Sequence, residues 1–265
     1  MDTPFLGLRY CHLSLYFYQL TLSAFPQLPI SMRLSSACFA LLLTVLCPAA
    51  SGVAAERAPR AETKTHWRLE TDKEGIKVYS RVSDDSRFKE IKVHCEMPGT
   101  LSQLVAMYSD VDQYPYVISN TKSARLLRRV SETELFYYLE TQMPTPVANR
   151  DVAMRLQFSY DAASQQLLIS TTHAAGLVPP QPGRVRVPYW SGLWTVRPLT
   201  PNRLQVDYTF RVDPGGELPT WLVNMVAPVA PYRSFVQLRR ALQLPRYQGR
   251  SFAFLSGPAA TTSQR

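Results

Sequence analysis

The stretch from residue 216 to residue 244 constrains the fold more than any other part of the chain. Read at helical spacing, its apolar side chains fall on one broad stripe. The stripe consists of Leu218, Trp221, Leu222, Met225, Val229, Tyr232, Phe235, Val236, Leu238 and Leu242. A helix with such a stripe is not stable alone in water, so the rest of the chain must supply an apolar surface that covers it.

Prolines divide this helical stretch. Pro219 suits a first helical turn, whereas Pro228 and Pro231 each remove a backbone donor and clash with the preceding turn. We therefore predict a kink or break near residues 227–230, which would let the first half move against the second. Two interpretations stay open: an ordinary core helix on a sheet, or a helix that closes over a ligand cavity.

About eight segments upstream read as strands, because apolar and polar residues alternate in them. They cover residues 76–82, 88–97, 122–130, 133–141, 151–160, 167–173, 184–198 and 203–213. Thr100 and Gln103 form a capping-box pattern that predicts a helix, and a second short helix is predicted over residues 111–119. Antiparallel hairpins with helices on one side give an α+β fold, in which a curved antiparallel sheet wraps around the long C-terminal helix.

The charge of the chain is basic but dispersed. The formal net charge is +9 at pH 7, and a basic protein can favour nucleic acid or an anionic membrane surface. Apart from Arg128 with Arg129 and Arg239 with Arg240, the arginines are scattered through strands and loops. Because no block resembles a nucleic-acid-binding tail, we expect no nucleic-acid partner and at most a transient contact with anionic lipid headgroups.

The N-terminal region has the order of a secretory signal. Residues 37–47 form an apolar run that follows Met32 and Arg33 and precedes small residues ending at Ala55. The run is too short to span a bilayer comfortably. We expect an exported protein, periplasmic in a bacterium; the alternative is an uncleaved membrane anchor over residues 5–47.

Four regions follow from these signals, with the true start expected at Met32. They are an N-terminal extension and signal over 1–55, a linker over 56–63, the folded domain over 64–247 and a flexible tail over 248–265. Cys95 is the one cysteine after the signal, so the domain has no internal disulfide. Cys95 alternates with apolar residues, and we interpret it as a small buried side chain.

The sequence shows no catalytic or metal-binding machinery. His66, His94 and His173 do not stand at metal-ligand spacing, and there is no nucleophile elbow or phosphate-binding loop. We expect no metal and no cofactor. Glu140 and His173 would form an acid/base pair only if both faced a cavity, and Asp151 is more simply a partner in a structural ion pair.

Several short motifs occur in a defined order along the domain. They are Trp67, residues 72–81, residues 88–90, residues 110–112 with Tyr114 and Pro115, Pro144 and Pro146 before residues 149–151, Arg186 before residues 192–194 and Pro198, and residues 213–216 before Pro219 and residues 221–224. Their joint order and spacing resemble a START lipid-binding domain of the bacterial type, in the helix-grip superfamily. The resemblance covers about residues 64–247.

The resemblance implies a helix-grip fold, an incomplete antiparallel barrel that grips the last helix and encloses a tunnel for a hydrophobic ligand. It also implies that the loop over residues 141–149 moves with that helix at the tunnel mouth. The residues it suggests for ligand binding are Tyr137, Met143, Arg150, Phe158, Arg186, Trp194, Tyr208, Leu222, Met225 and Val229. Aromatic residues of this kind are more often part of a plain core than of a ligand-binding wall, although a tunnel of this family would need them.

From the resemblance and the missing catalytic signals, we expect a monomeric, exported binding protein that sequesters or transfers a lipid or another hydrophobic molecule. One alternative is a helix-grip enzyme of the cyclase or hydrolase type, which would use pocket acids and bases. The other is a partner-binding domain with a filled core and no ligand.

Overall fold

The computed structural model describes residues 66–82 and 85–256. The chain divides into two units, Met1–Ala58 and Pro59–Arg265, and every described residue belongs to the second. The predicted signal, the predicted linker and residues 257–265 lie outside the described residues. None of the described helices has the length and apolar character needed to cross a membrane.

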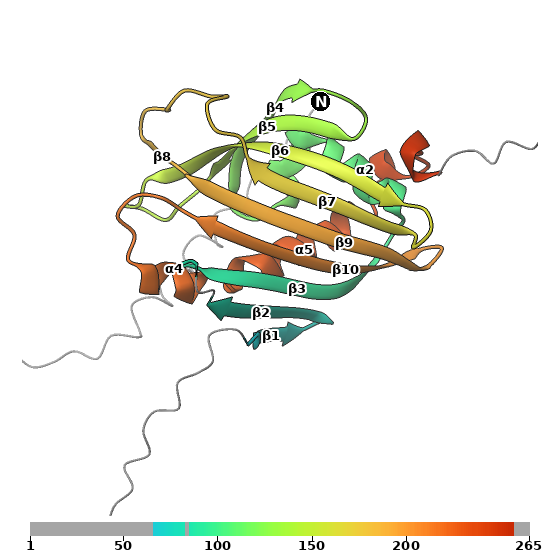
Figure 1. Cartoon of the computed structure of the whole chain (residues 1–265), viewed down its shortest axis with the longest axis horizontal. Helices are drawn as coiled ribbons and strands as arrows, with labels where there is room; N and C mark the ends of the chain where they lie inside the picture. The colour runs from blue at the N-terminus through green and yellow to red at the C-terminus, as the bar shows by residue number, and fades with distance from the viewer. Residues whose placement is uncertain (1–65, 83–84, 257–265) are drawn as a thin grey trace, which may run out of the picture. The chain divides into compact units, whose positions relative to one another are not determined.

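One large sheet organises the described chain (Figure 1). Its strands are β1 (Arg68–Lys73), β2 (Ile76–Val82), β3 (Lys89–Pro98), β4 (Thr121–Arg129), β5 (Glu134–Thr141), β6 (Asn149–Asp161), β7 (Gln166–His173), β8 (Arg184–Arg186), β9 (Tyr189–Thr200) and β10 (Arg203–Asp213). Their order is β1-β2-β3-β10-β9-β7-β6-β5-β4 with antiparallel pairing, and β8 pairs with β6 in parallel. The predicted α+β fold with an antiparallel sheet is confirmed, and in the described chain this sheet does not close into a barrel.

The helices are α2 (Leu101–Ser109), α3 (Tyr114–Val117), α4 (Thr220–Val226) and α5 (Val229–Ala241), with 3-10 turns η1 (Val111–Gln113), η2 (Pro245–Tyr247) and η3 (Ala253–Leu255). The predicted capping box is confirmed: the Thr100 hydroxyl accepts a hydrogen bond from the Gln103 amide, and the Gln103 side chain accepts one from the Thr100 amide. The predicted break is confirmed as well, since α4 ends before Ala227 and Pro228, and α5 begins after them.

Two parts of the sequence prediction were wrong or incomplete. The single strand expected over residues 184–198 is two strands, because Pro188 lacks a backbone donor and the chain turns there from pairing with β6 to pairing with β7 and β10. Within the predicted tail, the Phe254 ring stacks on Phe158 with a centroid separation of 6.0 Å. This stretch therefore packs on the core through its apolar residues Phe252, Phe254 and Leu255.

The core lies between the sheet and α5. Alternate residues of β6, such as Val152, Met154 and Leu156, belong to the same apolar cluster as Phe235 and Leu238 of α5. We call this face of the sheet the inner face and the opposite one the outer face. Cys95, on β3, is buried as predicted, and burial raises the pKa of its thiol to about 12.

Candidate functional site

Stacked aromatic rings fill the space between the sheet and α5. The Trp194 ring of β9 lies 4.2 Å from the Tyr208 ring of β10 and 5.0 Å from the Phe235 ring of α5, all measured between centroids. Tyr137 packs edge-on against Tyr114 at 5.3 Å. Burial raises the pKa of Tyr137 and of Tyr208, so both hydroxyls stay neutral.

The inner face of β10 becomes less covered along the strand. Leu204 and Val206, near its start, are 1% and 0% exposed. Tyr208, Phe210 and Val212 follow on the same face, and all three are only partly buried. The strand ends at the loop that leads into α4 (Figure 1). The apolar inner face is therefore incompletely covered where β10 ends.

The helix α4 is weakly embedded. Val223 is its one buried residue, and Leu222 is partly buried. The expectation that Met225 and Val229 lie on a core-facing stripe was wrong, because they are 59% and 55% exposed. The stripe was drawn for an unbroken helix, and the break at residues 227–228 changes the rotation of α4 relative to α5. Trp221 is also 67% exposed, so α4 displays an apolar surface.

One side chain fastens α4 to the sheet. The Asn224 amide oxygen accepts a hydrogen bond from the Lys89 backbone amide at 2.9 Å, and its nitrogen donates to the Arg87 carbonyl at 3.1 Å. α5 is held differently, since the Arg239 guanidinium donates to the carbonyl oxygens of Glu74 and Glu96 and Phe235 is buried. α5 is thus held at several positions, whereas α4 is held mainly by the side-chain hydrogen bonds of Asn224 and by the buried Val223.

The two hydrogen bonds of Asn224 lead to a first prediction. Replacing Asn224 with alanine should speed amide hydrogen exchange in α4 several-fold without changing exchange in α5, because the hydrogen bonds to Lys89 of β3 and to Arg87 just before it are lost. Hydrogen-exchange mass spectrometry measures both helices in one experiment. Gln237→Ala, on α5, is the control. Equal exchange rates in α4 of wild type and of the Asn224→Ala variant would show that the Asn224 hydrogen bonds do not hold α4.

Three other predicted residues lie at different places. Arg150, at the start of β6, is 5% exposed and lies on the inner face with Val152. Met143 is partly buried in the loop after β5, where its amide donates to Asn149 at 3.1 Å. Phe158 is buried under Phe254, eight residues further along β6 than Arg150, which is roughly 26 Å. Phe158 is therefore far from the α4 end of the sheet.

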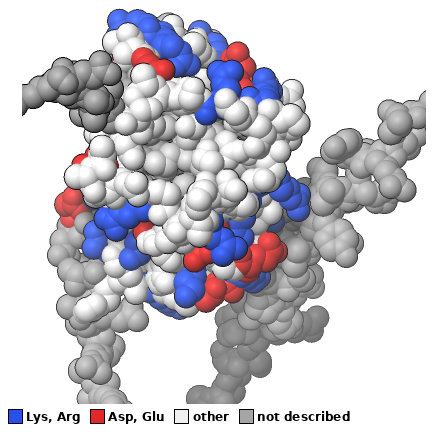
Figure 2. Space-filling view, turned by 90° about the vertical axis from the view of Figure 1, so that its right-hand side faces the viewer, with Lys and Arg blue, Asp and Glu red and all other residues white. Residues whose placement is uncertain are grey.

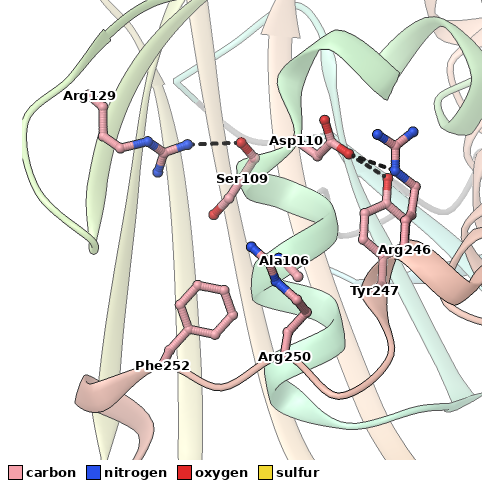
Figure 3. Close-up of a pocket in the computed structure, with 8 residues that line it drawn as sticks. All are labelled: Ala106, Ser109, Asp110, Arg129, Arg246, Tyr247, Arg250 and Phe252. Atoms are coloured by element: carbon pink, nitrogen blue, oxygen red, sulfur yellow. Dashed lines mark hydrogen bonds and ion pairs between the residues drawn. The ribbon is translucent and has the colours of Figure 1, made fainter.

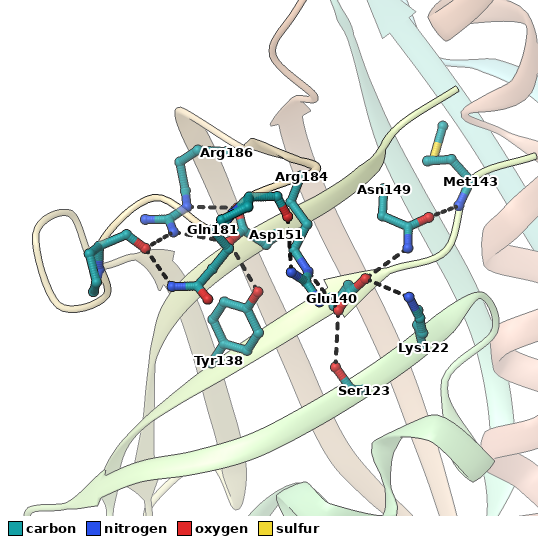
Figure 4. A network of polar contacts seen from close by, with 12 residues as sticks. Lys122, Ser123, Tyr138, Glu140, Met143, Asn149, Asp151, Gln181, Arg184 and Arg186 are labelled. Atoms are coloured by element: carbon teal, nitrogen blue, oxygen red, sulfur yellow. Dashed lines mark hydrogen bonds and ion pairs between the residues drawn. The ribbon is translucent and has the colours of Figure 1, made fainter. Parts of the chain in front are cut away.

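Arg186 is engaged on the outer face. Its guanidinium makes two parallel bonds to the carboxylate of Asp151, with Nε to Oδ1 at 2.8 Å and Nη2 to Oδ2 at 3.0 Å (Figure 4). The Tyr138 hydroxyl donates to the same carboxylate at 3.0 Å. Asp151 is in a structural ion pair as expected, and its partner is Arg186, not the neighbouring Arg150. The structure does not bring Arg186 together with the inner-face residues.

Glu140 belongs to the same outer-face network, since it lies opposite Asp151 in the β5–β6 ladder. Its carboxylate accepts bonds from Asn149 at 2.7 Å and pairs with Arg184 at 2.8 Å and Lys122 at 3.1 Å (Figure 4). Burial alone raises the pKa of Glu140, but these donors outweigh it and hold the pKa below the ordinary value. Glu140 is thus a charged structural group at neutral pH.

The acid/base pair considered for Glu140 and His173 is not formed. The centroid of the His173 ring lies 5.7 Å from that of the Tyr189 ring, while Glu140 has the partners just described. Within residues 66–82 and 85–256, no group of three or more His, Cys, Asp or Glu side chains is placed to hold a metal ion.

Two of the hollows on the described surface are notable for their size, and neither of these two is lined by the predicted ligand-binding residues. The first, of about 590 Å³, lies at the C-terminal end of α2 (Figure 3). Its lining residues are Ala106, Ser109, Asp110, Arg129, Arg246, Tyr247, Arg250 and Phe252. Arg246 pairs with Asp110 at 3.2 Å, and Arg129 donates to the Ser109 carbonyl at 2.9 Å. The second, of about 500 Å³, is lined mainly by residues of β2, β3 and the turn before β2.

Charged side chains on the face shown in Figure 2 form several small groups separated by uncharged surface, and basic and acidic residues are interspersed. This agrees with the scattered arginines of the sequence. On that face the positive charge is not gathered into one extended patch.

Sequence comparison relates the chain to known proteins. The family described as "Polyketide cyclase / dehydrase and lipid transport" matches residues 97–233, which is more than half of the chain. The mouse phosphatidylcholine transfer protein is 25% identical over 177 residues, covering 65% of this chain and 82% of that protein. An uncharacterised protein of Pseudomonas aeruginosa is 27% identical over 206 residues, covering 77% of this chain and 97% of its own length.

Solved structures share the fold. A STAR-related lipid transfer protein from Xanthomonas axonopodis superposes with a TM-score of 0.63 at 27% identity, covering 67% of this chain and 99% of that one. Human STARD10 superposes with a TM-score of 0.60 at 20% identity, over 68% of this chain and 74% of that one. The chain therefore belongs to the polyketide cyclase/dehydrase and lipid transport family and has the helix-grip fold of START domains.

Proposed function

We propose that this protein binds a lipid or another hydrophobic small molecule on the inner face of its sheet, beneath α4, and transfers or sequesters it. The similarity to a phosphatidylcholine transfer protein and to a STAR-related lipid transfer protein supports this proposal. We further propose that the protein is exported, because the N-terminal residues have the order of a secretory signal. The proposed carrier acts as a monomer.

The observation that carries the proposal is the incomplete cover of the inner face at one end. Tyr208, Phe210 and Val212 offer apolar surface that neither α4 nor α5 fully buries. The covering element there is α4, which has one buried residue and follows a loop containing Gly215 and Gly216. A ligand chain that entered beneath α4 would complete the burial of this surface.

The energetics favour a carrier that needs no catalytic group. Exposing an acyl chain to water costs about 0.8 kcal/mol per methylene, so a sixteen-carbon chain costs on the order of 12 kcal/mol. An apolar inner face lowers this barrier. Movement of α4 about residues 227–228 would open the path, while α5 stays anchored through Arg239.

The structure supports binding over catalysis. Glu140 and Asp151, the acids that the enzyme alternative would use, are both held in ion pairs on the outer face. No observation on the described residues favours the cyclase or hydrolase alternative.

The direct test is transfer of a fluorescent phospholipid from donor to acceptor vesicles. We expect the protein at micromolar concentration to accelerate transfer at least tenfold over spontaneous exchange. Transfer at the spontaneous rate, for phospholipids, fatty acids and sterols alike, would contradict a transfer role. Extraction of lipid from donor vesicles without delivery would indicate sequestration.

A second prediction concerns the exposed surface of α4. Trp221 and Met225 are 67% and 59% exposed, and such side chains suit the interface of a membrane. Replacing both with serine should slow transfer about thirtyfold, because each exposed apolar side chain contributes roughly 1 kcal/mol to insertion and a loss of about 2 kcal/mol corresponds to that factor. Thermal stability should stay nearly unchanged.

Leu193→Ser is the matched control, since Leu193 is 46% exposed on the outer face of β9. It should transfer lipid at the wild-type rate. An equal loss of transfer in the control would show that general surface hydrophobicity, not α4, sets the rate.

A further inference from the structure

Arg150 is a charged side chain in an apolar setting. It is 5% exposed and lies on the inner face of β6, the same face as Val152 and Met154. Its neighbours across the sheet are Thr141 of β5 and Val185 of β8. An arginine is rarely buried to this extent unless an anion compensates it.

The bonds of Arg150 leave its charge uncompensated. One terminal nitrogen donates to the Ala148 carbonyl, and the other donates to the Gly215 carbonyl at 3.4 Å, which is a long hydrogen bond. The Nε atom is buried and has no partner. Among the described residues, no carboxylate lies within ion-pair distance of Arg150. Carbonyl dipoles satisfy two donors but supply no negative charge.

The two acids next to Arg150 in the β5–β6 ladder are already neutralised elsewhere. Glu140 and Asp151 flank Arg150 in the β5–β6 ladder, but their side chains point to the outer face, where they pair with Lys122, Arg184 and Arg186. On that face, three basic side chains thus form ion pairs with two carboxylates. No acidic side chain of this network is left to balance Arg150 on the inner face.

The position of Arg150 matches the open end of the site. Its guanidinium contacts the loop that leads into α4, since a Cβ placed on Gly216 would lie 3.6 Å from Nη2. The partly covered apolar residues of β10 end at the same loop. A ligand with an apolar chain on the inner face would place its polar end beside Arg150.

We propose that Arg150 binds the anionic group of an amphipathic ligand, a carboxylate or a phosphate, through Nε and Nη2. The inference rests on the proposed function and narrows it to ligands that carry a negative charge next to an acyl chain. Guanidinium presents two donors in one plane and matches both oxyanions. The anion would replace the long bond to Gly215 and supply the missing charge.

The purely structural alternative is that Arg150 only ties the loop at Gly215 to β6. The two roles differ in what they predict for ligands. A tie would affect charged and uncharged ligands alike, whereas an anion site would distinguish them.

The experiment measures equilibrium binding of two chain-matched pairs: palmitate with hexadecanol, and phosphatidic acid with diacylglycerol. We expect wild type to bind at least one charged member about tenfold tighter than its uncharged match, as a charge-assisted hydrogen bond provides. The ligand pair that shows the preference identifies whether Arg150 binds a carboxylate or a phosphate. In the Arg150→Gln variant that preference should disappear, and in Arg150→Lys part of it should remain.

Arg155→Gln is the matched control, because Arg155 lies on the outer face of the same strand and pairs with Glu134 at 2.7 Å. It should keep the wild-type preference. Equal affinity for both members of each pair in wild type, or a preference that survives in Arg150→Gln, would overturn the inference and leave lipid binding intact. Failure of all four ligands to bind would overturn the proposed binding of acyl-chain lipids itself. If Arg150→Gln does not fold, the ratio of the affinities for charged and uncharged ligands, measured in wild type and in Arg150→Lys, still tests the inference.

Discussion

Replacing Asp151 with asparagine is expected to lower the free energy of unfolding by about 3 kcal/mol, because it leaves a partly buried guanidinium without its counter-charge. Asp151 is 1% exposed and makes two bonds to Arg186 and one to Tyr138. Burial and the bond to Asp151 raise the pKa of Tyr138 to about 12, so its hydroxyl remains a neutral donor that the variant satisfies less well. Urea unfolding followed by circular dichroism measures the change.

The matched control is an exposed pair. Arg203 and Glu96 lie 3.3 Å apart with side chains 62% and 53% exposed. Glu96→Gln should change stability by less than about 1 kcal/mol, since water screens such pairs. Similar losses in both variants would show that burial of the Asp151 pair is not what makes it important.

Replacing Phe235 with alanine should cost about 3–5 kcal/mol, the range for removing a buried aromatic ring. Phe235 is 1% exposed and stacks on Trp194 at 5.0 Å, so the change opens a cavity between α5 and the sheet. The midpoint of urea unfolding should fall while the slope stays near the wild-type value.

Tyr116→Ala provides the comparison, because Tyr116 is 76% exposed on α3. It should change stability by no more than about 0.5 kcal/mol. A loss below about 1 kcal/mol for Phe235→Ala would mean that α5 does not rest on the aromatic cluster as the structure describes.

Much of the fold follows from local patterns in the sequence. Alternation in β6 places Val152 and Met154 on one face, and the structure has them there. The capping box at Thr100 and the break before Pro228 are also local, because each depends on a few neighbouring residues. Such features need no knowledge of which strands pair.

The site is harder to predict because it depends on pairing between distant segments. Whether Arg186 faces a ligand depends on its parallel pairing with β6, which places it against Asp151. Whether Met225 is buried depends on how the chain rotates at the break, which the helical period cannot give. The isolation of Arg150 appears only once the partners of Glu140 and Asp151 are known.

The filled aromatic core and the proposed ligand site are compatible because they lie at different parts of the inner face. The rings of Trp194 and Phe235 stack between the sheet and α5, Tyr208 borders both parts, and Phe210 and Val212 continue toward α4 with partial cover. A ligand would extend the apolar core under α4 and need not replace the stacked rings.

Native mass spectrometry of the purified protein, after incubation with vesicles that contain neutral and anionic lipids, tests the central claim most directly. The account predicts a complex of one protein chain with one lipid molecule, and an acyl-chain mass that fragmentation recovers. The bare protein mass alone, across phospholipids, fatty acids and sterols, would contradict it.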